Sequence, residues 1–138
     1  MIVVGIGASA GGLEALLPFV SHLPSDTGMC FVIVQHGSAK QPSLLVDLLR
    51  KSSKLAVIEA CDGAQLRANT IFVAPYDADV SLEKEFIRLN DTEQQRVPRF
   101  SIDFFFTSLA ASYFDFVMLF VLKVTHLLIL DSFVFLAG

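Results

Sequence analysis

Apolar and polar positions follow one another in blocks that predict strands separated by helices over the first hundred residues. Continuous apolar runs, typical of strands buried in a parallel sheet, occur at residues 1–6, 29–35, 55–60 and 70–74. Apolar residues at helical spacing occur at 13–23, 43–49 and 102–112. This order predicts an α/β fold with a doubly wound, mostly parallel sheet in a Rossmann-like three-layer arrangement. In such sheets ligands bind where the strands end at their carboxyl side.

Residues typical of turns and helix caps lie between these segments. Small residues at 7–12 predict a turn after the first strand, and Asp62 with the following glycine predicts another. Two short apolar runs, 80–82 and 86–89, flank charged residues and predict a β-hairpin. Ser43 is the expected N-cap of the second helix.

Composition narrows the classes of protein that remain. The chain has 138 residues, 54% of them apolar, and a net charge of −4. The apolar fraction excludes a disordered chain, and the acidic balance excludes a basic nucleic-acid footprint. Cys30 and Cys61 have neither metal-site nor C-x-x-C spacing, so we expect a reduced chain in the cytoplasm with no metal.

The charged residues divide the chain unevenly. Residues 1–103 hold 21 of the 24 charged side chains, and nine of the 13 phenylalanines lie at or after Phe100. We therefore expect an α/β domain over 1–113 and an anomalous, Phe-rich apolar tail over 114–138.

This tail is the only candidate for a membrane span. Asp115, Lys123, His126 and Asp131 interrupt it. Because a charged residue at mid-membrane costs roughly 2.5–3.5 kcal/mol on the insertion scale, we expect no membrane insertion.

Candidate chemistry follows the first strand. Gly7, Ser9 and Gly11 form a G-x-S-x-G pattern between a predicted strand and a predicted helix. A nucleophile on such a sharp turn needs small residues on either side, and the turn exposes its hydroxyl above the sheet. The N–H groups that begin the next helix suit a developing oxyanion. Ser9 is therefore a candidate nucleophile.

A serine nucleophile needs a base, and His36 directly follows the second predicted strand. Neighbouring parallel strands end at the same edge, so His36 can reach Ser9. The alternative is that His36 only caps its strand in a polar loop; its match with Ser9 favours the catalytic interpretation. His22, near the end of the first predicted helix, suits the helix dipole and is expected to be structural.

The glycines also permit a dinucleotide-binding loop. Gly5 and Gly7 begin the G-x-G-x-x-G pattern, but Ala10 holds the third position and Gly11 comes one residue late. The second strand ends in Gln35 and a histidine, where a nicotinamide-binding fold needs an acidic residue. We therefore expect no cofactor.

Several segments resemble the CheB-type chemotaxis protein-glutamate methylesterase domain, closest to the form fused to receptor methyltransferases. They are residues 4–15 (VGIGASAGGLEA), 34–36 (VQH), 59–63 (EACDG), 69–75 (NTIFVAP) and 101–110 (SIDFFFTSLA). The resemblance runs from residue 2 to about residue 113, with the motifs in the family's order.

The resemblance implies hydrolysis of glutamate γ-methyl esters on the cytoplasmic region of methylated chemoreceptors, with release of methanol. Ser9 would attack the ester, His36 would move the proton, and a carboxylate would orient the imidazole. Receptor methyltransferase or kinase domains in a longer product are further implied partners. No metal or cofactor is implied.

The chain departs from the family after the strand expected at 116–122. The family has a Ser-Gly-x-Gly-x-Asp-Gly loop there, which supplies the carboxylate, whereas residues 123–128 read KVTHLL. Asp131 is the one later carboxylate, and Asp103 and Asp62 fit structural roles better. We expect a domain truncated or frameshifted near this point, with impaired activity and an apolar sheet edge that the tail either covers or makes stickier.

Two other functions stay open beside the dinucleotide-binding domain. One is a non-catalytic domain that binds receptors without needing Ser9. The other is a different serine hydrolase that uses the same Ser9–His36 pair on small esters.

Overall fold

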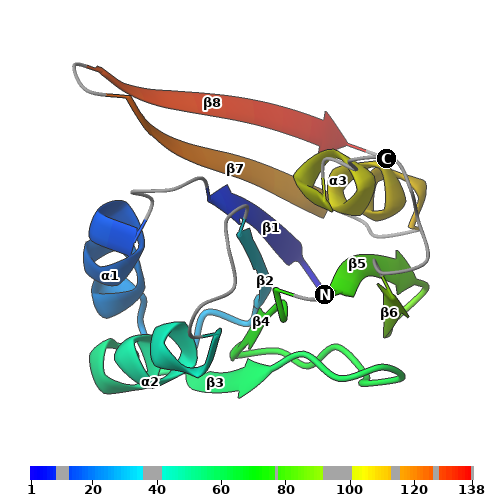
Figure 1. The fold of residues 1–138 in the computed structure, drawn as a ribbon, viewed down its shortest axis with the longest axis horizontal. Helices are drawn as coiled ribbons and strands as arrows, with labels where there is room; N and C mark the ends of the chain where they lie inside the picture. Colours follow the sequence, from blue (N-terminus) through cyan, green and yellow to red (C-terminus); the bar gives the residue numbers. More distant parts are fainter. Residues whose placement is uncertain are drawn as a thin grey trace.

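The computed structural model describes residues 1–8, 13–35, 42–76, 78–91, 101–112, 116–125 and 128–137. Figure 1 shows the chain as one sheet flanked by helices, with a small hairpin to one side. In chain order the elements are β1 (Val3–Ala8), α1 (Leu13–His22), β2 (Cys30–Gln35), α2 (Pro42–Ser52), β3 (Ala56–Glu59), β4 (Thr70–Val73), β5 (Ala78–Glu83), β6 (Phe86–Asp91), α3 (Ser101–Ala111), β7 (Phe116–Thr125) and β8 (Leu128–Ala137).

The main sheet has the strand order β3-β4-β2-β1-β7-β8. Every neighbouring pair is parallel except β7 and β8, which are antiparallel. The predicted mostly parallel sheet is therefore confirmed. The predicted hairpin is confirmed too, as the separate antiparallel pair β5-β6.

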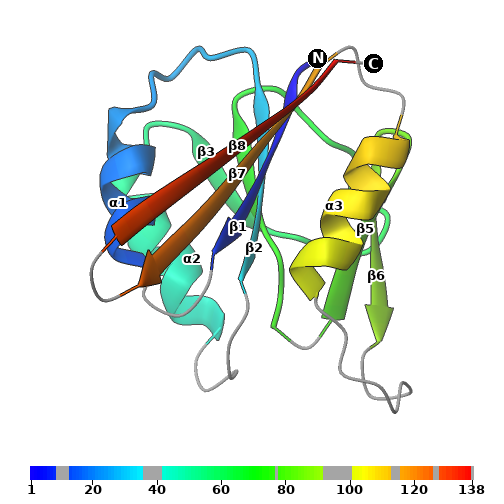
Figure 2. The same cartoon turned by 90° about the horizontal axis from the view of Figure 1, so that it is seen from above.

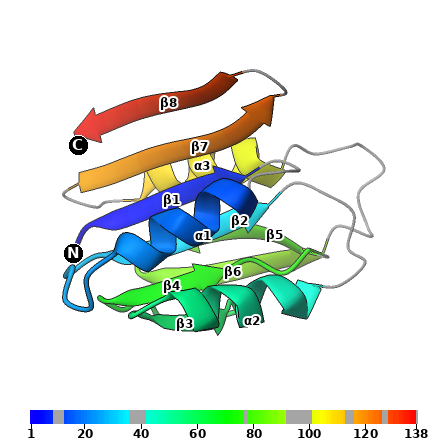
Figure 3. The same ribbon diagram turned by 90° about the vertical axis from the view of Figure 1, so that its left-hand side faces the viewer.

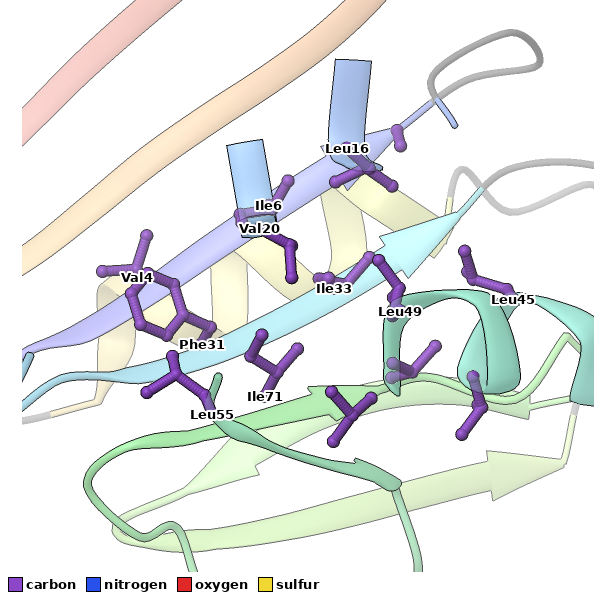
Figure 4. Close-up of a cluster of buried hydrophobic side chains, with 14 residues drawn as sticks. Val4, Ile6, Leu16, Val20, Phe31, Ile33, Leu45, Leu49, Leu55 and Ile71 are labelled. Carbon is purple, nitrogen blue, oxygen red and sulfur yellow. The ribbon is translucent and has the colours of Figure 1, made fainter. Parts of the chain in front are cut away.

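Helices cover both faces of the sheet, as the doubly wound prediction requires. Figure 2 shows α1 and α2 on one face and α3 with the β5-β6 hairpin on the other. Each face has its own apolar core. The core beneath α1 and α2, shown in Figure 4, includes Val4, Ile6, Leu16, Val20, Phe31, Ile33, Leu45, Leu49, Leu55 and Ile71. The core beneath α3 includes Val3, Val32, Val34, Phe72, Val80, Leu82, Ile87, Phe105 and Leu109.

Two local predictions are wrong, each by a small displacement. The second helix begins at Pro42, so Ser43 lies inside it and is not the N-cap. Proline suits the first helical position because its fixed φ is already helical and its missing N–H would have no helical partner. Gly7 and Ala8, which were expected in a turn, are the last two residues of β1, and residues 9–12 lie outside the described residues.

The apolar tail forms two long strands. β7 is parallel to β1, as expected for residues 116–122, but it continues to Thr125. β8 then pairs with β7 along its whole length, so β8 covers the edge that β7 would otherwise leave open (Figure 3). In the part of the chain that the structure describes, no helix is long and apolar enough to cross a membrane.

Candidate functional site

The two predicted site residues directly follow two paired strands. β1 and β2 are parallel neighbours, and their last residues, Ala8 and Gln35, are register partners. Ser9 and His36 are the next residues along the chain, and both lie outside the described residues. The two strands therefore end side by side at one edge of the sheet, as the sequence predicted (Figure 3).

Two glycines let α3 pack closely over β1. A Cβ added to Gly5 would lie 2.7 Å from Leu109 Cδ2, and one added to Gly7 would lie 2.7 Å from Ile102 Cγ2. Carbon atoms in contact normally lie about 3.5–4.0 Å apart. Helix packing therefore explains both glycines of the dinucleotide-like pattern, without a bound phosphate.

The packing also gives the direction of α3. Gly7, at the carboxyl end of β1, faces Ile102 near the start of the helix, and Gly5 faces Phe105 and Leu109 one to two turns later. The beginning of α3 thus lies at the carboxyl edge of the sheet, where β1 and β2 end.

A side-chain contact ties the end of β2 to the chain that follows β4. The hydroxyl of Tyr76, three residues after the end of β4, donates a hydrogen bond to Oε1 of Gln35. Both side chains are half-buried. The contact holds the residue that immediately precedes His36. Sequence reasoning missed Tyr76, because its only signal was a tyrosine after a strand-ending proline.

Sequence reasoning also missed a buried carboxylate near the same edge. Asp79, in β5, is only 2% exposed. Its Oδ1 atom has no hydrogen-bond partner among the described residues. The available signal was an acidic residue next to the buried, apolar residues of a predicted hairpin strand.

Three other polar residues, Asp62, Asp103 and His22, were expected to have structural roles. Oδ1 of Asp62 accepts a hydrogen bond from the Leu89 backbone N–H at 2.9 Å, which joins its turn to β6. Asp103 is exposed in the first turn of α3. Nδ1 of His22 lies 2.6 Å from the Pro18 carbonyl oxygen at the end of α1. The contacts of Asp62 and His22 agree with the structural roles expected for these two residues.

Asp131, the late carboxylate, lies in β8. Its register partner in β7 is Leu122, and Leu122 also pairs with Ala8. Two strand spacings of about 4.8 Å separate the backbone of Asp131 from that of Ala8. Within the described ranges, no three His, Cys, Asp or Glu residues gather as a metal site would require.

Comparison with known proteins decides the family. The sequence model of the CheB methylesterase family matches residues 4–122. The chain belongs to the CheB methylesterase family. Its fold is similar to that of the CheB methylesterase catalytic domain of Thermotoga maritima, with a TM-score of 0.75 and 25% identity. That match covers 89% of this chain and 67% of the Thermotoga chain.

Curated relatives agree with this assignment to the CheB family. The chain is 30% identical over 112 residues to a protein-glutamate methylesterase/protein-glutamine glutaminase of Maricaulis maris, covering 78% of this chain and 28% of that protein. It is 36% identical over 111 residues to a protein of the same name, numbered 2, in Anaeromyxobacter dehalogenans, covering 80% of this chain and 33% of that protein. The chain thus spans about a third of the length of these relatives or less.

Proposed function

We propose that this CheB-family chain is a protein-glutamate methylesterase that acts on the cytoplasmic region of methylated chemoreceptors, with Ser9 as nucleophile and His36 as general base. The pairing of Ala8 with Gln35 at the ends of two adjacent parallel strands carries the proposal. The names of the Maricaulis and Anaeromyxobacter relatives support the substrate. Receptor methyltransferase or kinase domains in a longer product are proposed neighbours, and the cytoplasm is the proposed location.

The proposed reaction is an acyl transfer to serine followed by hydrolysis. The Ser9 hydroxyl attacks the γ-ester carbonyl while the imidazole of His36 takes the hydroxyl proton. The N–H groups at the start of α1, near Leu13, stabilise the developing oxyanion. The C–O bond to methoxide then breaks, and His36 gives its proton to the departing methanol. Water attacks the acyl-enzyme by the same proton transfers and releases the glutamate carboxylate.

The same proposal includes a low rate. Residues 123–128 lack the Asp-containing loop from which the family takes its orienting carboxylate, and β7 continues through Lys123 to Thr125 instead. Altering that carboxylate in a serine protease lowers kcat by about 10⁴-fold. We expect a loss of comparable size relative to intact relatives.

The test is covalent labelling of the purified chain with a fluorophosphonate probe. Labelling should disappear in Ser9→Ala and persist in the matched control Ser25→Ala, whose side chain is exposed in the turn after α1. It should fall strongly in His36→Gln but not in His22→Gln.

A second assay addresses the substrate. Methanol release from methylated receptor should depend on Ser9, as labelling does. Labelling without methanol release would favour a different serine hydrolase acting on small esters. Receptor binding that survives Ser9→Ala, with no labelling of the folded chain, would instead support the non-catalytic interaction domain.

A further inference from the structure

β8 is the last strand of the main sheet, and its outer edge faces away from β7. The strand has ten residues, Leu128–Ala137, and it pairs with β7 over all of them. Figure 3 shows it as the outermost strand, with β7 on one side. Within the described residues, no strand pairs with its other side. The backbone N–H and C=O groups along such an edge can pair with a further strand.

The segments outside the described residues are attached to other parts of the chain. Most of them adjoin elements other than β8 at both ends, namely residues 9–12, 36–41, 77, 92–100 and 113–115. Residues 126–127 and 138 adjoin β8, and they are too few to pair along its ten residues. We therefore expect the strand that covers this edge to come from a second molecule.

The sequence of β8 lacks the features that keep sheet edges from pairing. It reads LILDSFVFLA, with Asp131 as its one charged residue and with neither proline nor lysine. Edge strands normally avoid pairing because they are short or carry charges, prolines or bulges. The opposite edge of the sheet follows this rule, since β3 has four residues and ends in the exposed Glu59. A nearly continuous apolar run is instead typical of a strand inside a sheet.

We propose that β8 is a dimerisation surface, which pairs in antiparallel orientation with β8 of a second copy of this chain. A two-fold dimer brings the same patch of both copies together, and for a strand edge this symmetry gives antiparallel pairing. The two six-stranded sheets join into one continuous sheet, in which β8 is an interior strand. This inference does not depend on the proposed esterase activity.

Symmetry also restricts the register of the proposed pair. Residues whose backbone groups face one side of a strand occur at every second position, so the numbers of two paired residues must add to an even number. The longest such registers centre on Ser132, pairing residues 128–136, or on Phe133, pairing residues 129–137. Each forms roughly eight to ten hydrogen bonds between the copies, a usual number for a protein interface. In both registers Asp131 lies opposite Phe133 or Phe135, so the two aspartates do not face each other.

Analytical ultracentrifugation of the purified chain over a concentration series tests the dimer. Ser132→Lys brings two lysines close together at the centre of either register, so the Kd of the dimer should rise roughly tenfold or more. The matched control is Ala56→Lys, which adds the same charge to the exposed first residue of β3, at the other edge, and should leave the Kd unchanged. A wild type that stays monomeric, that forms open-ended assemblies, or that dimerises as tightly as Ser132→Lys would overturn the proposal.

Disulfide cross-linking introduces no charge, in case Ser132→Lys does not fold, and it reads the register directly. The background is Cys61→Ser, in which the remaining Cys30 is buried. Opposed Cα atoms of antiparallel strands lie about 4.5–5.5 Å apart, within the span of a disulfide, about 4.4–6.8 Å. On mild oxidation Ser132→Cys or Phe133→Cys should therefore give a covalent dimer, much faster than Ala56→Cys on β3. Equally slow cross-linking at all three positions would reject the pairing of β8 with its copy.

Discussion

The packing of α3 on β1 makes Gly5 a sensitive test of the fold. An alanine Cβ at this position would lie 2.7 Å from Leu109 Cδ2 and 2.9 Å from ring carbons of both Phe105 and Phe106. Phe105 and Leu109 are completely buried, so neither has open space to turn into. The three contacts come from side chains of one helix, so these side chains or the helix itself must shift to relieve them.

Whether Gly5→Ala raises or lowers the free energy of unfolding distinguishes a packing clash from the effect of backbone freedom. Gly5 is not among the residues with positive φ. Without a clash, Gly5→Ala would therefore stabilise the chain by about 0.4–1 kcal/mol, by restricting the unfolded state. Overpacking a filled core costs about 1–3 kcal/mol. Since three contacts are violated together, we expect a net loss of about 2 kcal/mol, which corresponds to a fall in Tm of roughly 6–10 °C for a chain of this size.

Thermal and urea unfolding of Gly5→Ala, followed by circular dichroism, measures this loss. The double variant Gly5→Ala/Leu109→Ala provides the internal control. Leu109→Ala removes one of the three clashing atoms, so the loss in the double variant should be smaller than the sum of the two single losses. An unchanged or raised Tm in Gly5→Ala would refute the argument that α3 lies against this glycine.

Three further predictions concern the buried Cys30 and the loop residue Asn69. Burial raises the pKa of the Cys30 thiol from 9.0 to about 12, whereas Cys61 is exposed. A thiol reagent at pH 8 should therefore modify one cysteine in the folded chain and two after denaturation. Cys61→Ser should abolish the reaction of the folded chain. The unfolded chain loses the Cys30 proton near pH 9, while the folded chain keeps it. The free energy of unfolding should therefore fall as pH rises from 9.0 toward about 12. In urea titrations, Cys30→Ala should remove this pH dependence. Asn69 adopts a φ of 57° and its Oδ1 accepts a hydrogen bond from the Gly28 backbone N–H at 2.8 Å. Asn69→Ala should thus lower the free energy of unfolding by about 1–3 kcal/mol, and Asn69→Gly by less, because glycine adopts positive φ freely; equal losses would contradict the role assigned to φ.

The strands were predictable because parallel strands covered on both faces must be apolar at successive positions. All six residues of β1 are buried, as are five of the six in β2, and each strand was expected from a continuous apolar run. The hairpin was predictable from its charged turn between two apolar runs. The boundaries predicted at Gly7 and Ser43 were displaced for a local reason. Gly7 suits a turn as well as the strand end that it occupies, and Pro42 suits a turn as well as the first position of α2.

Part of the candidate site was likewise predictable from the sequence, and part was not. Ser9 and His36 are predictions from motif and strand order, and the register of Ala8 with Gln35 is the part that the structure adds. Asp79 could not be predicted, since its burial depends on β5 packing against α3, more than twenty residues later in the chain. The Tyr76–Gln35 contact likewise joins residues 41 positions apart.

By itself, the sequence determined the class of fold, the order of its elements and the place where chemistry is expected. Those properties follow from hydrophobic periodicity and from short motifs, which act over a few neighbouring residues. Only the tertiary structure decided why Gly5 and Gly7 must lack side chains, which carboxylate is buried, and that the apolar tail adds two strands to the sheet beside β1. These depend on distances between distant segments, and such distances are set by the packing of the whole chain.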